Sequence, residues 1–317
     1  MKRCELGFPQ HRSARNWLDG CLRIVIAVQC FGLAGRYLFS PNERESDVFE
    51  WLQFDFHWPE PLVQSIDNAG AWLTLAAGLL LCVAGIVRPR MDPESMLGRS
   101  LRWLDGTAAL WIAVWVFTMA VAHRMRATLY ADLTFAEDAV RYVAPLALLL
   151  LINRPTRRLE IERGGFQAER AAVILLMLAA AATFAAHGYK AIECYGPFMD
   201  LVLLSDMRWT QFYPSESTVQ RSLVAIGVVD LLVAILLVVA RWPAVAFYMA
   251  VWGGVAAASR MTAFGFSAWP ETLLRAANGG VPLAILGYWI VSRRQRSVQP
   301  ETTASPDTST PHQCETP

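Results

Sequence analysis

Eight long apolar runs, separated by short charged segments, constrain the fold of this chain more than any other feature. The runs cover roughly 21–39, 69–87, 104–123, 138–153, 170–188, 222–240, 242–259 and 272–291. Runs of about 20 apolar residues match the thickness of the hydrocarbon core of a bilayer. A soluble fold would need every run to be a core helix with almost no polar face, and only 17% of all residues are charged. The sequence therefore predicts an all-α integral membrane protein with eight transmembrane helices.

Basic residues gather on one side of the predicted spans. They lie in the segment 1–20, between the second and third spans, between the fourth and fifth, and after the eighth, whereas the first opposite loop is acidic. By the positive-inside rule the basic side is cytoplasmic. We therefore predict a multi-pass protein of a bacterial cytoplasmic membrane with both termini cytoplasmic. No small-x-small cleavage pattern follows the long basic leader, so the first span should stay uncleaved. The tail 297–317 is rich in Thr, Ser, Pro and Glu and is predicted to be disordered.

The two halves of the chain match each other in sequence. The matches keep their order: Phe56, Glu60, Val63 and Gln64 with Phe212, Glu216, Val219 and Gln220; Arg124-Met125 with Arg260-Met261; and Pro145-Leu-Ala-Leu-Leu with Pro282-Leu-Ala-Ile-Leu. Residues 21–158 and 169–292 are thus predicted to be two copies of one four-span unit. Because each unit has an even number of spans, both face the same way. The expected architecture is two tandem four-helix bundles, a parallel internal repeat.

The outer loop after the first span of each unit is long and aromatic. The first loop carries Phe49, Trp51, Phe54, Phe56 and Trp58, and the second carries Phe198, Trp209, Phe212 and Tyr213. Trp and Tyr favour the depth of the lipid headgroups, so these residues could form an ordinary interfacial belt. A lid over a pocket is the alternative, and the sequence leaves both open.

Two charged residues fall inside predicted spans, where a charge is costly and needs a reason. Asp230 lies near the middle of its span and has no counterpart in the first half. It is either a proton-accepting or ligand-pairing carboxylate, or a structural ion pair or neutral buried acid. Arg141 lies one turn before Pro145 and could form an anion site, although a pair with Glu137 or Asp138 on the same helix is the commoner arrangement. Pro145 and Pro282 each remove a backbone donor and free a carbonyl.

A set of basic residues marks the outer ends of the spans. Arg36 and Lys190 end the first spans of the two units, Arg124 and Arg260 end the third spans, and His123 and His187 stand beside them. Snorkelling to headgroups explains such residues without any function. The competing hypothesis is a basic rim that binds an anionic or quinone-like head group, with His187 exchanging protons near neutral pH.

Several classes of site have no signature in this sequence. The six cysteines show no Cys-x-x-Cys spacing and no metal-like His partner, so no metal site is predicted. The net charge of +1 argues against nucleic acid as a partner. No phosphate-binding glycine loop or hydrolase motif occurs, and no cofactor motif is evident. Gly253-Gly254 and Gly279-Gly280 are interpreted as close-packing surfaces between helices.

The second half resembles the DoxX-like family of small four-helix membrane proteins. His187, Gly188 and Lys190 match the signature that ends the family's first span, and Asp230 through the apolar run to Arg241 matches its second span. The first half is a weaker match without the acid. The chain departs from the family pattern in being doubled and in its long aromatic loops. The resemblance implies a role near quinones or in respiratory redox systems, without supplying a catalytic residue.

Three functions follow from these observations. The first is an accessory or quinone-linked subunit of a membrane redox system, with the bilayer and a redox subunit as partners. A small-solute or proton-coupled transporter is the second, and a non-catalytic membrane scaffold is the third. Whether the protein is an enzyme is left open by the sequence.

Overall fold

The computed structural model describes residues 14–39, 45–92, 94–127, 129–152 and 158–298, and in these ranges the regular structure is entirely helical. The long helices are α1 (Ala14–Ala34), α3 (Glu60–Val87), α4 (Met96–Arg126), α6 (Ala139–Ile152), α7 (Arg158–Ile192), α9 (Glu216–Val239), α10 (Pro243–Phe264) and α12 (Ala276–Val298). Shorter α-helices connect them: α2 (Asp47–Glu50), α5 (Thr134–Glu137), α8 (Gly196–Ser205) and α11 (Trp269–Leu274). The remaining helical elements of the described residues are the short π-helices η1 (Gly35–Phe39), η2 (Trp51–Asp55) and η5 (Asp206–Thr210) and the 3₁₀ turns η3 (Arg88–Arg90), η4 (Ala131–Leu133) and η6 (Phe266–Ala268).

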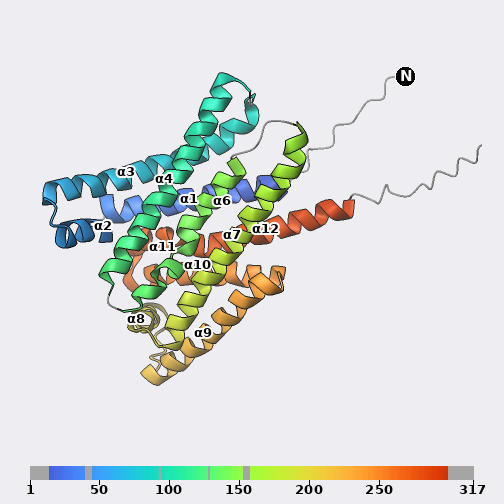
Figure 1. The fold of residues 1–317 in the computed structure, drawn as a ribbon. Helices are drawn as coiled ribbons and strands as arrows, with labels where there is room; N and C mark the ends of the chain where they lie inside the picture. The colour runs from blue at the N-terminus through green and yellow to red at the C-terminus, as the bar shows by residue number, and fades with distance from the viewer. Residues whose placement is uncertain (1–13, 40–44, 93, 128, 153–157, 299–317) are drawn as a thin grey trace, which may run out of the picture.

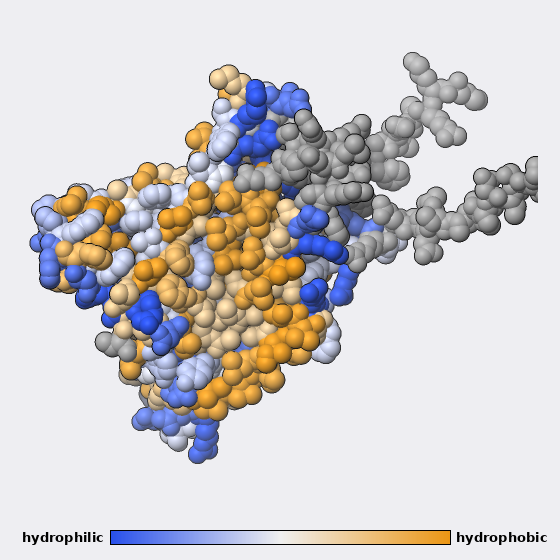
Figure 2. All heavy atoms as spheres, viewed as in Figure 1, coloured by the Kyte–Doolittle hydropathy of each residue, from blue (hydrophilic) through white to orange (hydrophobic). Residues whose placement is uncertain are grey.

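Six segments of the described chain are long and apolar enough to cross a membrane. They are Ala14–Phe39, Glu60–Val87, Met96–Arg126, Gln167–Ile192, Glu216–Val239 and Pro243–Phe264. Large apolar side chains such as Leu232, Ile235 and Val239 on α9 are exposed on the outside of the bundle. Figure 2 shows hydrophobic residues along the face that α9 occupies in Figure 1. An apolar surface of this kind suits lipid rather than water, and the prediction of an all-α, multi-pass membrane protein is confirmed.

Helices α6 and α12 cover the other two predicted spans, and both pack inside the molecule. The described part of α6 is short and lies against α1, α4 and α7, while α12 lies against α1, α7 and α10 (Figure 1). Because α12 packs against other helices, it can contain Asn278 and Pro282. In a span that faced lipid on all sides, the same residues would raise the free energy of insertion. The count of eight spans therefore stays a prediction, as does the division into repeated units.

The two helix prolines have the effect predicted for them. Pro145 lacks the N–H that would bind the carbonyl of Arg141, and the side-chain amide of Gln29 donates to that carbonyl instead, at 3.2 Å. In α12, Pro282 stands four residues after Asn278 and likewise leaves the Asn278 carbonyl without its helical donor.

Glycines let three helices approach closely. A Cβ on Gly253 would lie 2.5 Å from the Asn278 carbonyl oxygen, and one on Gly279 would lie 2.6 Å from the carbonyl oxygen of Ala250. Gly280 faces Val25 of α1 at similarly short range. The close-packing interpretation is confirmed at these three positions. It is wrong at Gly254, where an added Cβ would meet nothing within 4 Å.

A buried ion pair joins α1 to α4. The guanidinium of Arg23 donates to both carboxylate oxygens of Asp105 at 2.7 Å, and the residues are 3% and 0% exposed. Asp19 and Arg88 extend the network from either side. Nothing in the sequence predicted this pair. Most of that leader (residues 1–13) and the predicted tail from 299 lie outside the described residues.

Candidate functional site

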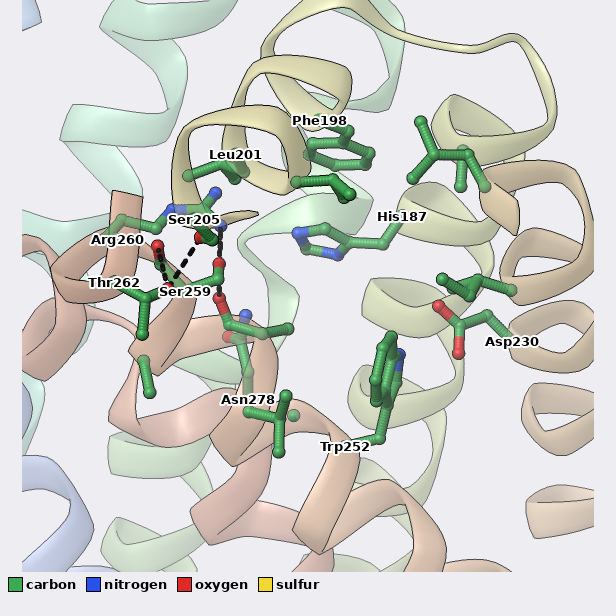
Figure 3. A pocket seen from close by; sticks show the side chains of 18 of the residues that line it. His187, Phe198, Leu201, Ser205, Asp230, Trp252, Ser259, Arg260, Thr262 and Asn278 are labelled. Carbon is green, nitrogen blue, oxygen red and sulfur yellow. Dashed lines mark hydrogen bonds between the residues drawn. The ribbon is translucent and has the colours of Figure 1, made fainter. Parts of the chain in front are cut away.

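A cavity of about 650 Å³ lies in the second half of the chain, among α7, α8, α9 and α10. Its walls are mainly apolar, with side chains such as Phe184, Leu201, Leu223 and Trp252. A few polar groups converge on this apolar space, among them His187, Ser205, Asp230, Ser259, Arg260 and Asn278 (Figure 3). A mostly apolar pocket with a few polar groups is typical of small-molecule sites.

The crossing of α7 and α9 brings His187 and Asp230 to this cavity. The crossing point is made by two glycines, because a Cβ on Gly227 would lie 2.4 Å from the Gly188 carbonyl oxygen. Only glycine allows two helix backbones to approach this closely. His187 precedes Gly188 directly, and Asp230 follows Gly227 by three residues on the same wall.

Asp230 is buried and incompletely satisfied. Its side chain is 4% exposed, and its Oδ1 atom has no hydrogen-bond partner. Asp230 forms no ion pair within the described parts of the chain. A structural ion pair therefore does not explain why an acid lies inside this span. Figure 3 shows its carboxyl facing the cavity above Trp252.

Arg260 brings a positive charge to the cavity wall near the C-terminal end of α10. Its Nη1 atom donates to the carbonyl oxygen of Ala256 and to the hydroxyl of Ser259, both at 3.1 Å. No carboxylate of the described residues forms an ion pair with it. A guanidinium has five N–H donors, so donors remain for a ligand in the cavity.

His187 stands between the cavity and an acidic residue. Its Nδ1 atom lies 2.8 Å from the Thr183 carbonyl oxygen, so Nδ1 carries a proton. Its Nε2 atom lies 3.6 Å from a carboxylate oxygen of Glu137 on α5. The imidazole ring stacks on Phe198 with 8° between the planes and 5.9 Å between the centroids. His187 therefore has a fixed orientation and a tautomer set by its neighbours.

Four other predicted site residues are paired with carboxylates. Lys190 binds Glu137, Arg36 lies 2.5 Å from Glu271, Arg141 lies 2.7 Å from Asp138, and Arg124 lies 2.5 Å from Asp132. The Arg141 pair is the intrahelical arrangement named as the alternative to an anion site. None of the four lines the cavity. Of the seven candidates, the structure brings together His187, Asp230 and Arg260.

Two of the rim pairs join one half of the chain to the other. Glu137 of the first half binds Lys190 of the second, while Glu271 of the second half binds Arg36 of the first. Burial raises the pKa of Glu137, but the charges of His187, Lys190 and Arg141 outweigh it and lower that pKa to about 2. Burial likewise opposes ionisation of Glu271, and Arg275 and Arg36 lower its pKa nonetheless. Both carboxyls are therefore anionic near neutral pH.

The second aromatic loop forms part of the cavity wall. Phe198, Trp209 and Phe212 all line it, and the indole N–H of Trp209 donates to the Thr262 carbonyl oxygen at 3.1 Å. This contact ties the second loop to the mouth of the cavity. Trp209 and Phe212 are nevertheless exposed, as are Phe54 and Trp58 of the first loop, so the lid and the interfacial belt both stay open.

Asp206 holds this loop in place, and we expect acid to weaken it. The carboxylate accepts hydrogen bonds from the Thr210 hydroxyl and from the backbone N–H groups of Phe212 and Tyr213, and the Thr210 bond contributes most to lowering its pKa. Because the folded-state pKa lies below the unfolded value of about 3.9, the stabilisation is complete above that value and is lost as the pH falls through the folded-state pKa. Thermal unfolding of wild type and Asp206→Asn should differ by a constant amount above pH 5 and converge in stronger acid. A difference that is independent of pH throughout would contradict this role.

Sequence reasoning missed several groups of the site. Asn278, Trp252, Ser205 and Thr262 were not predicted to belong to it. An asparagine inside an apolar run, one turn before Pro282, was a usable signal. The two hydroxyl residues had none, because loops and helix ends commonly carry Ser and Thr. In the described ranges, no three His, Cys, Asp or Glu side chains come together as a metal ion would require.

Comparison with known proteins gives no match: no protein-family model, no curated protein and no solved structure matches the chain. The described residues therefore show an all-helical, multi-pass membrane protein that contains a mainly apolar cavity with the cation Arg260 on its wall.

Proposed function

We propose that this protein is a DoxX-like membrane protein with a duplicated four-helix unit, and that it serves as a quinone-linked subunit of a membrane redox system. The observation that carries the ligand part of this proposal is Arg260, a cation without a carboxylate partner on the wall of an apolar cavity.

The order of elements supports the duplication. In each half, a long first helix is followed by a short helix that continues into a π-helical segment (α2 with η2, α8 with η5) and then by the second long helix. The fourth long helix of each half follows a short helix, α5 or α11, and carries the matched proline, Pro145 or Pro282. Contacts run α1–α3–α4–α6 in one half and α7–α9–α10–α12 in the other.

The chemistry of the cavity supports a quinone-like ligand. A quinone head group offers carbonyl oxygens, which accept hydrogen bonds from donors such as the Arg260 guanidinium, and its tail suits the apolar walls. Val255 lines the cavity and is also 51% exposed, beside the exposed Val251 on the apolar outer face of α10. The cavity thus adjoins the apolar outer face of α10, which is the face we propose a ligand dissolved in the bilayer would approach.

Arg260→Gln should weaken quinone binding by about tenfold or more, because a hydrogen bond to a charged group is worth about 1.5–3 kcal/mol. The measurement is calorimetric titration of the protein in lipid nanodiscs with a decyl-tailed benzoquinone, corrected with empty nanodiscs. Arg124→Gln is the matched control, since Arg124 ends the corresponding helix of the first half and pairs with Asp132 outside the cavity. It should change the affinity by less than about twofold. Absence of saturable binding by the wild type would overturn the proposal.

The unpartnered oxygen of Asp230 favours a second candidate, proton-coupled transport of a small solute. Solute uptake by proteoliposomes that is abolished in Asp230→Asn would support this alternative. The orientation with cytoplasmic termini, the bacterial cytoplasmic membrane and the redox partner subunit are parts of the proposal that rest on the charge pattern and the family resemblance.

A further inference from the structure

The cavity contains two acceptor oxygens that no group of the protein satisfies. Asp230 Oδ1 and Asn278 Oδ1 are buried without a hydrogen-bond partner, in side chains that are 4% and 6% exposed. A buried polar atom without a partner costs free energy, and the cost is larger for a charged group. Both residues line the cavity, and they come from different helices, α9 and α12. A ligand that donates hydrogen bonds would therefore be favoured at this wall.

Hydrogen-bond donors lie on another part of the cavity wall. Arg260, with the hydroxyl of Ser259 beside it, is a donor, and Figure 3 shows it across the cavity from Asp230, with His187 between them. The site thus offers donors on one side and an acceptor on the other. A ligand that satisfies both sides must itself carry acceptors and donors.

The two redox forms of a quinone differ in this respect. An oxidised quinone has carbonyl oxygens only, which accept from Arg260 but have no hydrogen to donate to an ionised Asp230. A quinol has two ring hydroxyls, each of which donates one hydrogen bond and still accepts others. With Asp230 ionised, only the reduced form can bind Arg260 and the Asp230 carboxylate at the same time.

We infer that the cavity selects the reduced, hydroxyl-bearing form of its ligand, a quinol with an apolar tail, and that Asp230 is the residue that discriminates it from the quinone. This inference rests on the proposed function, because it names the redox state recognised at the same site. Asp230 is a specificity-determining residue, and Arg260 binds both forms.

The first test uses the wild-type protein. In nanodiscs, under anaerobic conditions, the decyl-tailed quinol should bind about tenfold more tightly than the corresponding quinone, since a hydrogen bond to a charged acceptor is worth about that factor. Equal affinities would overturn the selection while leaving the proposed quinone site intact. Failure of both forms to bind would overturn the proposed function and this inference together.

Two variants separate the roles of the two walls. Asp230→Leu removes the acceptor at similar side-chain size, so it should abolish the preference by weakening the quinol alone. Arg260→Gln should weaken both forms by a similar factor and leave the preference in place. Asp200→Leu is the control, because Asp200 is an exposed acid on α8 that does not line the cavity. A quinol preference that survives in Asp230→Leu, with melting unchanged from wild type, would refute the assignment to this residue.

Discussion

Replacing Asp105 with Ala should lower the free energy of unfolding by about 3–5 kcal/mol, which is the usual cost of removing one partner of a buried ion pair. Asp105 is fully buried and takes two hydrogen bonds from Arg23, so the substitution would leave a guanidinium inside the bundle with most of its compensation removed. Asp19 retains contact with Arg23 at 2.8 Å and lies at the partly exposed side of the network, which limits the relief it can give. Reversible unfolding in mixed detergent micelles would measure the change.

Asp132→Ala provides the control for this prediction. Asp132 also pairs with an arginine, Arg124, but its side chain is 89% exposed. An exposed pair contributes about 0.2–1 kcal/mol, so the control should unfold close to the wild type. If the two variants lost equal free energy of unfolding, burial would not explain how the Arg23–Asp105 pair stabilises the fold.

The second large effect is expected at Gly253, where alanine should destabilise the fold by about 1–3 kcal/mol through overpacking. The added methyl would overlap the Asn278 carbonyl oxygen, and that oxygen belongs to helix backbone, which cannot swing aside as a side chain would. Since Asn278 lines the cavity, the same change should also weaken ligand binding.

The neighbouring Gly254 is the matched control. It has the same helix and the same sequence context, but an added Cβ meets nothing within 4 Å. Gly254→Ala should therefore stabilise the helix by up to about 1 kcal/mol, the difference in helix propensity. The measurement is thermal unfolding of both variants side by side, and a loss at Gly254 as large as that at Gly253 would rule out the packing explanation.

Hydropathy predicted the helical membrane fold because bilayer thickness acts directly on the composition of each run. The described part of α6 is apolar but only 14 residues long, and α12 carries Asn278 and Pro282 among its apolar residues. The eight-span count therefore rests on the apolar runs alone, and the duplication rests on the matched motifs.

The site could be predicted only in part, and the reason is that a single sequence lists charges without their partners. Arg36, Lys190 and Arg260 looked equivalent as basic residues at the ends of predicted spans. They differ in the structure because Glu137 and Glu271, which are distant in sequence from their partners, bind Lys190 and Arg36 and leave Arg260 unpaired by any described acid. Asp230 was noticed as an unusual charge, but its contact with a cavity depends on the glycine crossing of α7 and α9.

The exchange of counter-ions between the two halves has a consequence for how the protein can exist. Glu137 pairs with Lys190, and Glu271 pairs with Arg36 as well as with Arg275 of its own half, so two ion pairs cross from one half to the other. A half produced alone would lose the partner that the other half supplies to each of these pairs. The halves are thus mutual complements rather than independent modules, and separately produced halves would have to associate before these ion pairs could form.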